Sequence, residues 1–129
     1  SKKWPYYSIL ISQLRVKYNT KYDVVVAPGP GEIEESKLLN AHVILDQGKV
    51  LRLNQLISLI KDASFVIAND TGPAHICTHM NIPGLVLFGS HTSAHKVSIE
   101  SKKFKPISVK NLSLLKAETV MEEVKKILN

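Results

Sequence analysis

The stretch NDTGPAH, residues 69–75, places small and polar residues between an apolar run and a helix-like run. Gly72 lets the backbone approach a ligand closely, and Pro73 suits a first helical turn because it has no N–H to leave unpaired there. Unpaired amides at a helix start, with the positive end of the helix dipole behind them, favour an anion. Thr71 adds a hydroxyl, and Asp70 is either the helix cap or an orienting acceptor. This chemistry predicts an anion-binding loop, with a well-capped helix that binds nothing as the alternative.

Five histidines raise the question of a metal site. His75 and His79, like His91 and His95, are four residues apart, a spacing that puts two side chains on one helix face. Neither pair carries the glutamate of an H-E-x-x-H motif, and no acidic third ligand follows at a set spacing. We therefore predict no metal site. His75 is expected to brace the loop or face a phosphate, and His79 to be half-buried on its helix.

The apolar patterns around these residues predict short strands that alternate with helices. The expected strands are 23–28, 41–46, 64–69, 84–89 and 106–110. The expected helices are 5–18, one within 28–40, 54–63, 73–81 and 117–129. Parallel neighbours need crossover connections, and helices are the usual crossover, so the fold class is α/β with a doubly wound, Rossmann-like parallel sheet. Ligands of such sheets bind outside the carboxyl ends of the strands, where residues 69–75 fall.

Length and composition indicate one domain, residues 1–129, because a chain of this size with 44% hydrophobic content buries a single core. No apolar stretch approaches the ~18 residues that a membrane span requires, and residues 1–7 lack the apolar core of a secretory signal. The single cysteine, Cys77, lies in an apolar-periodic run, where a small buried hydrophobe is favoured over a nucleophile. We expect a cytoplasmic protein.

The formal net charge of +6 comes almost wholly from lysine, because Arg15 and Arg52 are the two arginines, and aromatic residues make up 6% of the chain. Proteins that recognise nucleic acids combine aromatic residues with arginine on one face or present a basic helix, so no nucleic-acid partner is expected. The positive charge favours an anionic partner, either a phosphorylated ligand or the surface of an acidic membrane leaflet.

Four blocks of the sequence match one family pattern in the same order. KKWP at 2–5 is similar to a K-x-W-P opening, PGPGE at 28–32 to a G-G-P-x-E turn, and GLVLFGSHTS at 84–93 to a strand with an L-F-G-P-T segment. SFVIANDTGPAHI at 64–76 resembles a strand followed by the signature D-[TS]-G-x-x-H. These blocks are typical of glycosyltransferase family 9, the ADP-heptose lipopolysaccharide heptosyltransferases. Such GT-B enzymes have two Rossmann-like domains facing across a cleft, and the chain resembles only the C-terminal, nucleotide-sugar-binding one.

The resemblance implies a set of donor-binding residues. Lys2 matches the lysine associated with the donor phosphates, and Glu32 matches the acidic residue on the ribose hydroxyls. Leu51 falls in the region that lines the adenine pocket, although Arg52 stands where the family usually has a small hydroxyl residue. The phosphate loop and the later matching segment supply the rest: Asp70, Thr71, Gly72, Pro73, His75 and Thr92. The family's general base is a carboxylate on the N-terminal domain, so no catalytic residue is expected in this chain, and no metal or other cofactor is implied.

The implied reaction moves a heptose from ADP-heptose to a lipopolysaccharide core acceptor, with peripheral association at the cytoplasmic face of the inner membrane. The acceptor site belongs to the other domain, so the chain on its own is expected to be an inactive fragment of a two-domain enzyme. The alternative is a non-catalytic remnant or stand-alone nucleotide-binding module of the same fold. An unrelated nucleotide-binding Rossmann-like protein is a third hypothesis.

The family pattern also has a strand and a glycine-bearing loop directly before its K-x-W-P block, and the sequence starts at Ser1. If strands 23–28 and 64–69 flank the place of that first, central strand, its absence leaves a gap two strand spacings wide, about 9 to 10 Å. Three outcomes are open: the two strands pair directly, a second copy lends a strand in a homodimer, or the domain loses stability. We expect direct pairing.

Overall fold

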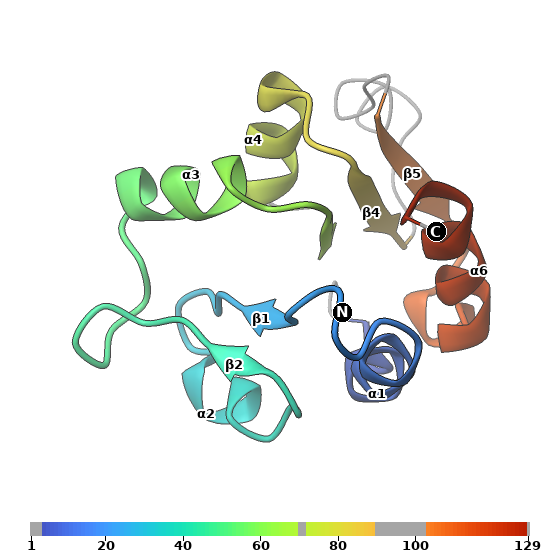
Figure 1. Ribbon diagram of the computed structural model, residues 1–129, viewed down its shortest axis with the longest axis horizontal. Helices are drawn as coiled ribbons and strands as arrows, with labels where there is room; N and C mark the ends of the chain where they lie inside the picture. Colours follow the sequence, from blue (N-terminus) through green and yellow to red (C-terminus); the bar gives the residue numbers. More distant parts are fainter. Residues whose placement is uncertain (1–3, 70–71, 90–102, 129) are drawn as a thin grey trace.

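The computed structural model describes residues 4–69, 72–89 and 103–128. Within them the chain alternates between helices and strands, as the sequence predicts (Figure 1). The helices are α1 Tyr7–Lys17, α2 Ile33–Ser36, α3 Leu53–Lys61, α4 Gly72–Met80 and α6 Ala117–Leu128, with a 3₁₀ turn η1 at Leu112–Leu114. The strands are β1 Val25–Val26, β2 His42–Val43, β3 Val66–Asn69, β4 Gly84–Phe88 and β5 Phe104–Ser108. None of the described helices combines the length and the apolar character needed to cross a membrane.

The strands form two parallel sheets instead of one. β1 pairs with β2, and β3, β4 and β5 form a three-stranded sheet with β4 in the centre. Among the described residues no strand lies between β1 and β3, and these two strands do not pair with each other. The expectation of direct pairing is therefore wrong, whereas the exchanged strand and the lower stability stay predictions.

Direct pairing requires the covering helices to shift, and α1 is held in place by several contacts. The segment that begins α1 is tied to the three-stranded half of the molecule, because the Trp4 indole N–H donates to the Leu115 carbonyl oxygen at 2.7 Å. The Tyr6 hydroxyl donates to the Ser113 carbonyl oxygen at 2.8 Å, and α1 packs along α6. These contacts hold α1 beside η1 and α6 and oppose such a shift.

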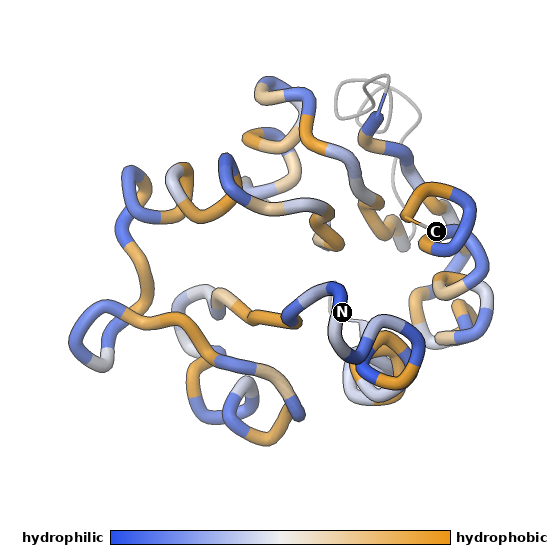
Figure 2. Tube along the Cα trace, viewed as in Figure 1, coloured by the Kyte–Doolittle hydropathy of each residue, from blue (hydrophilic) through white to orange (hydrophobic). Residues whose placement is uncertain are grey.

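The core follows the alternation of side chains along β4, which is buried throughout. Leu85 and Leu87 face a cluster formed with α1, η1 and α6, whereas Val86 and Phe88 face a second cluster formed with α3 and α4. Helices therefore cover both faces of this sheet, as a doubly wound fold requires. Figure 2 shows both apolar and hydrophilic residues along α6. Its buried residues have the spacing of one helix face, which packs on the sheet: Ala117, Val120, Met121 and Val124.

The two-stranded sheet is shorter and less buried than expected. Val25 of β1 is 43% exposed, although the apolar run at residues 23–28 is typical of a buried strand. Both β1 and β2 contain only two residues, because each has the other as its one partner among the described strands. β5 starts at Phe104, earlier than the expected residue 106, since Phe104 is fully buried against α3 and α4. Pro106, which has no N–H, is tolerated because β5 is an edge strand.

The end of α4 is closed by a Schellman motif. Asn81 has a φ of 56°, and its N–H donates to the Thr78 carbonyl oxygen at 3.2 Å. The Ile82 N–H donates to the Cys77 carbonyl oxygen at 3.1 Å, which completes the pair of bonds that satisfies the last carbonyls of a helix. The helix thus ends sharply before β4, and its length between β3 and β4 is fixed.

Candidate functional site

The start of α4 stands at the carboxyl end of β3. Asn69 is the last residue of β3, and Gly72 is the first residue of α4. Pro73 and His75 are half-buried in the first turns, and Ala74 between them is fully buried. A nine-residue helix that begins at a strand end directs its first backbone amides and the positive end of its dipole outward. The expected anion-binding loop thus has the strand and the helix that it needs.

Several of the predicted site residues lie outside the described residues: Lys2, Asp70, Thr71 and Thr92. His91 and His95 are outside them as well. His79 is exposed on α4, where the sequence predicted a half-buried residue, because it projects from the side of the helix opposite the buried Ala74 and Cys77. Within the described ranges no three His, Cys, Asp or Glu side chains come together in a way that could hold a metal ion.

Glu32 occupies the N-cap position of α2, and its carboxylate bonds back to the turn that precedes the helix. Glu32 Oε1 accepts a hydrogen bond from the Gly29 N–H at 2.9 Å. Gly31, between them, has a φ of +78°, a conformation that glycine adopts without strain. The side chain is half-buried, and the following Glu34 and Glu35 are exposed. Glu32 thus helps to shape the turn, a structural role that the sequence did not predict for it.

Sequence reasoning missed Tyr7, a half-buried residue of α1 that contacts the end of β3. Its hydroxyl donates to Asn69 Oδ1 at 2.7 Å, at the end of β3. Burial raises the pKa of Tyr7 far above its ordinary value, and the negative charge of Glu32 raises the pKa further. The phenol therefore stays protonated and donates to the last residue of β3. Tyr7 follows the W-P pair closely, but no local pattern indicates a partner 62 residues away.

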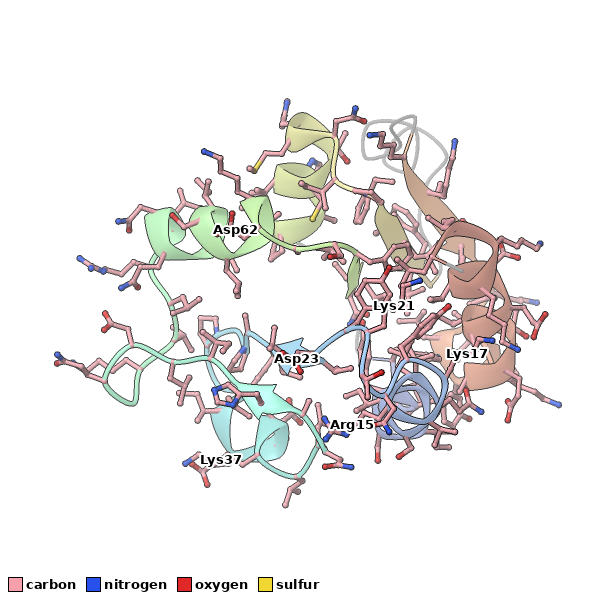
Figure 3. The ribbon with its side chains drawn as sticks, viewed as in Figure 1. Arg15, Lys17, Lys21, Asp23, Lys37 and Asp62 are labelled. Carbon is pink, nitrogen blue, oxygen red and sulfur yellow. The ribbon has the colours of Figure 1, made fainter. Side chains whose placement is uncertain are left out.

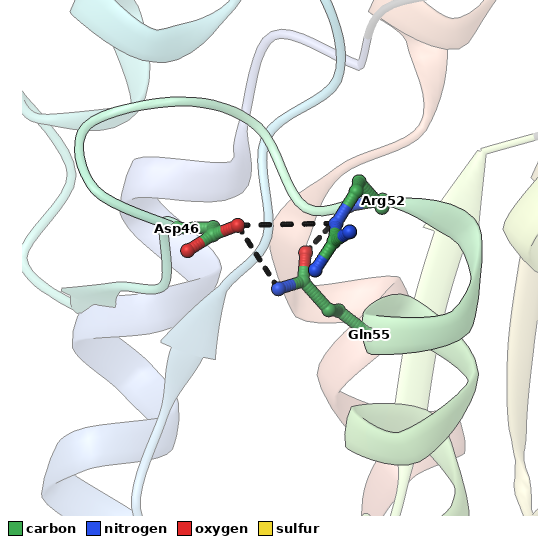
Figure 4. Close-up of polar contacts among 3 residues, drawn as sticks. All are labelled: Asp46, Arg52 and Gln55. Atoms are coloured by element: carbon green, nitrogen blue, oxygen red, sulfur yellow. Dashed lines mark hydrogen bonds and ion pairs between the residues drawn. The ribbon is translucent and has the colours of Figure 1, made fainter.

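Leu51 and Arg52 precede α3, which packs against α4. Leu51 is half-buried. Figure 4 shows the polar contacts that fix this segment. The Arg52 N–H donates to Gln55 Oε1 at 2.8 Å, Gln55 Nε2 donates to Asp46 Oδ2 at 3.0 Å, and Arg52 Nε lies 3.9 Å from the same oxygen.

The Arg52 side chain is 71% exposed, so its charge is directed to Asp46 and solvent. Asp46 belongs to a tight turn in which Gln47 and Gly48 both have positive φ, at 51° and 82°. Two positive φ values in succession are typical of a type I′ turn. The turn therefore supplies the anchor that holds the start of α3.

The basic side chains do not gather on one described surface. Figure 3 shows Arg15, Lys17 and Lys21 around the end of α1, and Lys37 apart from them beside α2. Lys37 pairs with Glu34 at 3.2 Å, and two lysines of α6 pair with glutamates three residues earlier. Such exposed pairs contribute little to stability but spread the positive charge. The described residues thus offer no stripe of the kind that binds nucleic acids.

The chain matches the model of glycosyltransferase family 9 (heptosyltransferase) over residues 1–126. Its fold is similar to that of the E. coli heptosyltransferase WaaC solved with ADP-2-deoxy-2-fluoro heptose, with a TM-score of 0.80 and 21% identity over 97% of the chain. The same enzyme solved with ADP gives a TM-score of 0.79 and 20% identity over 97% of the chain. The chain spans 39% and 40% of the length of those two structures. A search of curated proteins found no significant match.

Proposed function

Because the chain belongs to glycosyltransferase family 9, we propose that it is the donor-binding part of a GT-B heptosyltransferase and holds the diphosphate of an ADP-sugar at the start of α4. The observation that carries this proposal is the arrangement of Asn69, Gly72 and Pro73, which brings a helix N-terminus to the carboxyl end of a parallel strand. The similar E. coli enzyme was solved with ADP and with an ADP-sugar analogue, which supports a nucleotide-sugar ligand.

The proposed chemistry of this part is stabilisation of the leaving group. In an inverting transfer the bond between the anomeric carbon and the diphosphate breaks while the acceptor oxygen bonds to the opposite face of that carbon. The negative charge that develops on ADP is met by the outward amides near Gly72 and Ala74, which are in place before the reaction. Lys2 adds a positive charge at the diphosphate, and Glu32 accepts hydrogen bonds from the ribose hydroxyls. The proton of the acceptor passes to a base on the other domain of the enzyme.

Donor binding is tested by titrating the 129-residue chain with ADP, by calorimetry and by NMR. We expect weak but measurable binding, with chemical-shift changes centred on Thr71, Gly72 and Ala74. Gly72→Val is expected to abolish binding, because its side chain occupies the space that the phosphate needs. A thermal unfolding curve close to that of the wild type shows that the variant is folded. Unchanged affinity in folded Gly72→Val, or shifts that avoid residues 71–74, would contradict the proposal.

The second candidate function is nucleotide binding without transfer. The similar structures are longer than this chain, which spans 39% and 40% of their length. Both candidates predict ADP binding at the start of α4, and they differ in whether a sugar is transferred. In the first, the acceptor is a lipopolysaccharide core and the enzyme works in the cytoplasm at the inner membrane surface.

A further inference from the structure

We infer that Tyr7 is a positioning residue for the donor site: its hydroxyl holds the side chain of Asn69 at the end of β3, close in sequence to the start of α4. The effect of Tyr7 on donor binding rests on the proposed function. Its structural part, the bond by which Tyr7 holds Asn69, stands on the geometry alone.

The phenol ring of Tyr7 is held by contacts other than its bond to Asn69. The Trp4 ring meets it edge-on, with centroids 4.9 Å apart and an interplanar angle of 84°. Trp4 is itself buried, and its indole N–H is bonded to the Leu115 carbonyl oxygen. The hydroxyl therefore projects from a ring that other contacts hold, and its 2.7 Å bond to Asn69 Oδ1 joins two ordered residues.

The consequence falls on the end of β3. The Asn69 backbone is held in register with Leu87 of β4, and its side-chain oxygen is held by Tyr7, so both ends of the residue are fixed. The Tyr7 bond therefore fixes the Asn69 side chain at the carboxyl end of β3, three residues before Gly72 begins α4.

The chemistry of the pair is stable over the physiological pH range. An amide oxygen accepts and a neutral phenol donates, so the bond needs Tyr7 to keep its proton. Burial and the nearby Glu32 carboxylate both raise the pKa of Tyr7, which keeps the hydroxyl a donor well into alkaline solution.

The test compares Tyr7→Phe with Tyr6→Phe in the 129-residue chain. Both changes remove one hydroxyl and keep the ring, and the Tyr6 hydroxyl also donates one bond, of 2.8 Å, but to the Ser113 carbonyl oxygen in η1 and not to β3. In NMR spectra without ligand, Tyr7→Phe should move the signals of the Asn69 side chain and of the Gly72 and Ala74 amides. Tyr6→Phe should leave these three signals in place. Unmoved signals in Tyr7→Phe overturn the inference, whether or not ADP binds.

Titration with ADP then tests whether the Tyr7 hydroxyl increases the affinity of the donor site. We expect Tyr7→Phe to weaken ADP about three- to tenfold, the effect of one lost hydrogen bond, and Tyr6→Phe to leave the affinity unchanged. In an Asn69→Ala background Tyr7→Phe should have no further effect, because Tyr7 acts through Asn69. Equal weakening by the two tyrosine variants, or a full additional loss in the Asn69→Ala background, overturns the inference. Failure of the wild type to bind ADP overturns the proposed function, while the ligand-free amide signals still decide whether Tyr7 positions the start of α4.

Discussion

The hydroxyl of Tyr7 and the side-chain oxygen of Asn69 lie 2.7 Å apart, although 62 residues separate them in sequence. This bond joins the first turn of α1 to the last residue of β3, directly before the proposed donor loop. Together with the Trp4 and Tyr6 bonds to the segment before α6, it holds α1 to the three-stranded sheet. The same bonds thus connect α1 with both the end of β3 and the segment before α6.

Glu32 is expected to contribute to ribose binding separately from its role in the turn. Glu32→Gln keeps an oxygen that can accept from the Gly29 N–H but loses the charge, whereas Glu32→Ala loses both. We expect Glu32→Ala to weaken ADP by about 1 to 3 kcal/mol, the range for a charge-assisted hydrogen bond, and Glu32→Gln to weaken it less. Calorimetry with ADP and with inorganic pyrophosphate measures this. An equal loss for pyrophosphate, which has no ribose, would show that Glu32 acts only through the turn.

Gly84→Ala is expected to destabilise the protein severely. A Cβ at this position would collide with the Val66 carbonyl oxygen and approach the Phe104 ring to 2.8 Å. Because both belong to neighbouring strands of a tightly packed sheet, we expect a loss of about 2 to 3 kcal/mol in the free energy of unfolding. The matched control is Gly89→Ala, where the nearest atom, Leu112 Cγ, is 3.5 Å away, an ordinary contact. Urea unfolding that gives the two variants the same midpoint would contradict this account of the packing.

Stability is expected to fall in alkaline solution through Cys77. Burial raises the pKa of this thiol from 9.0 to about 11, so the folded protein holds the proton more tightly than the unfolded chain. A raised folded-state pKa stabilises fully below about pH 9, and this contribution is lost as the pH rises toward 11. Urea midpoints measured at pH 8 and pH 10.5 should therefore fall less in Cys77→Ala than in the wild type. An identical fall in both proteins would remove Cys77 as the cause.

The Cys77 thiol is also expected to resist modification in the native state. The residue is fully buried between α4 and the sheet, which confirms its sequence-based interpretation as a small hydrophobe. At pH 8 an aromatic disulfide reagent should react at a rate set by unfolding, and fully within the mixing time in denaturant, since the thiolate is the reactive form. Rapid reaction of the folded protein would mean that the helix α4 opens without global unfolding.

The 129-residue chain is expected to transfer no sugar by itself, because the proposed donor part supplies neither a general base nor an acceptor site. The assay supplies ADP-heptose with a lipopolysaccharide core acceptor and measures release of ADP and glycosylation of the acceptor. Heptose transfer above the uncatalysed rate would refute this expectation and would require a base among the residues of this chain.

The sequence by itself determined the alternation of strands and helices, the start of a helix at Gly72 and Pro73, and the membership in a family. These features depend on local patterns, since apolar periodicity, a proline in a first turn and short motifs are legible residue by residue. Only the tertiary structure decided that Tyr7 bonds Asn69, that Glu32 supports its own turn, and that the strands divide into two sheets. A contact such as Tyr7 with Asn69 depends on how a helix packs against a distant strand end, and no local pattern encodes that packing. The length of β1 was misjudged for the same reason, because a strand extends only as far as a neighbouring strand pairs with it.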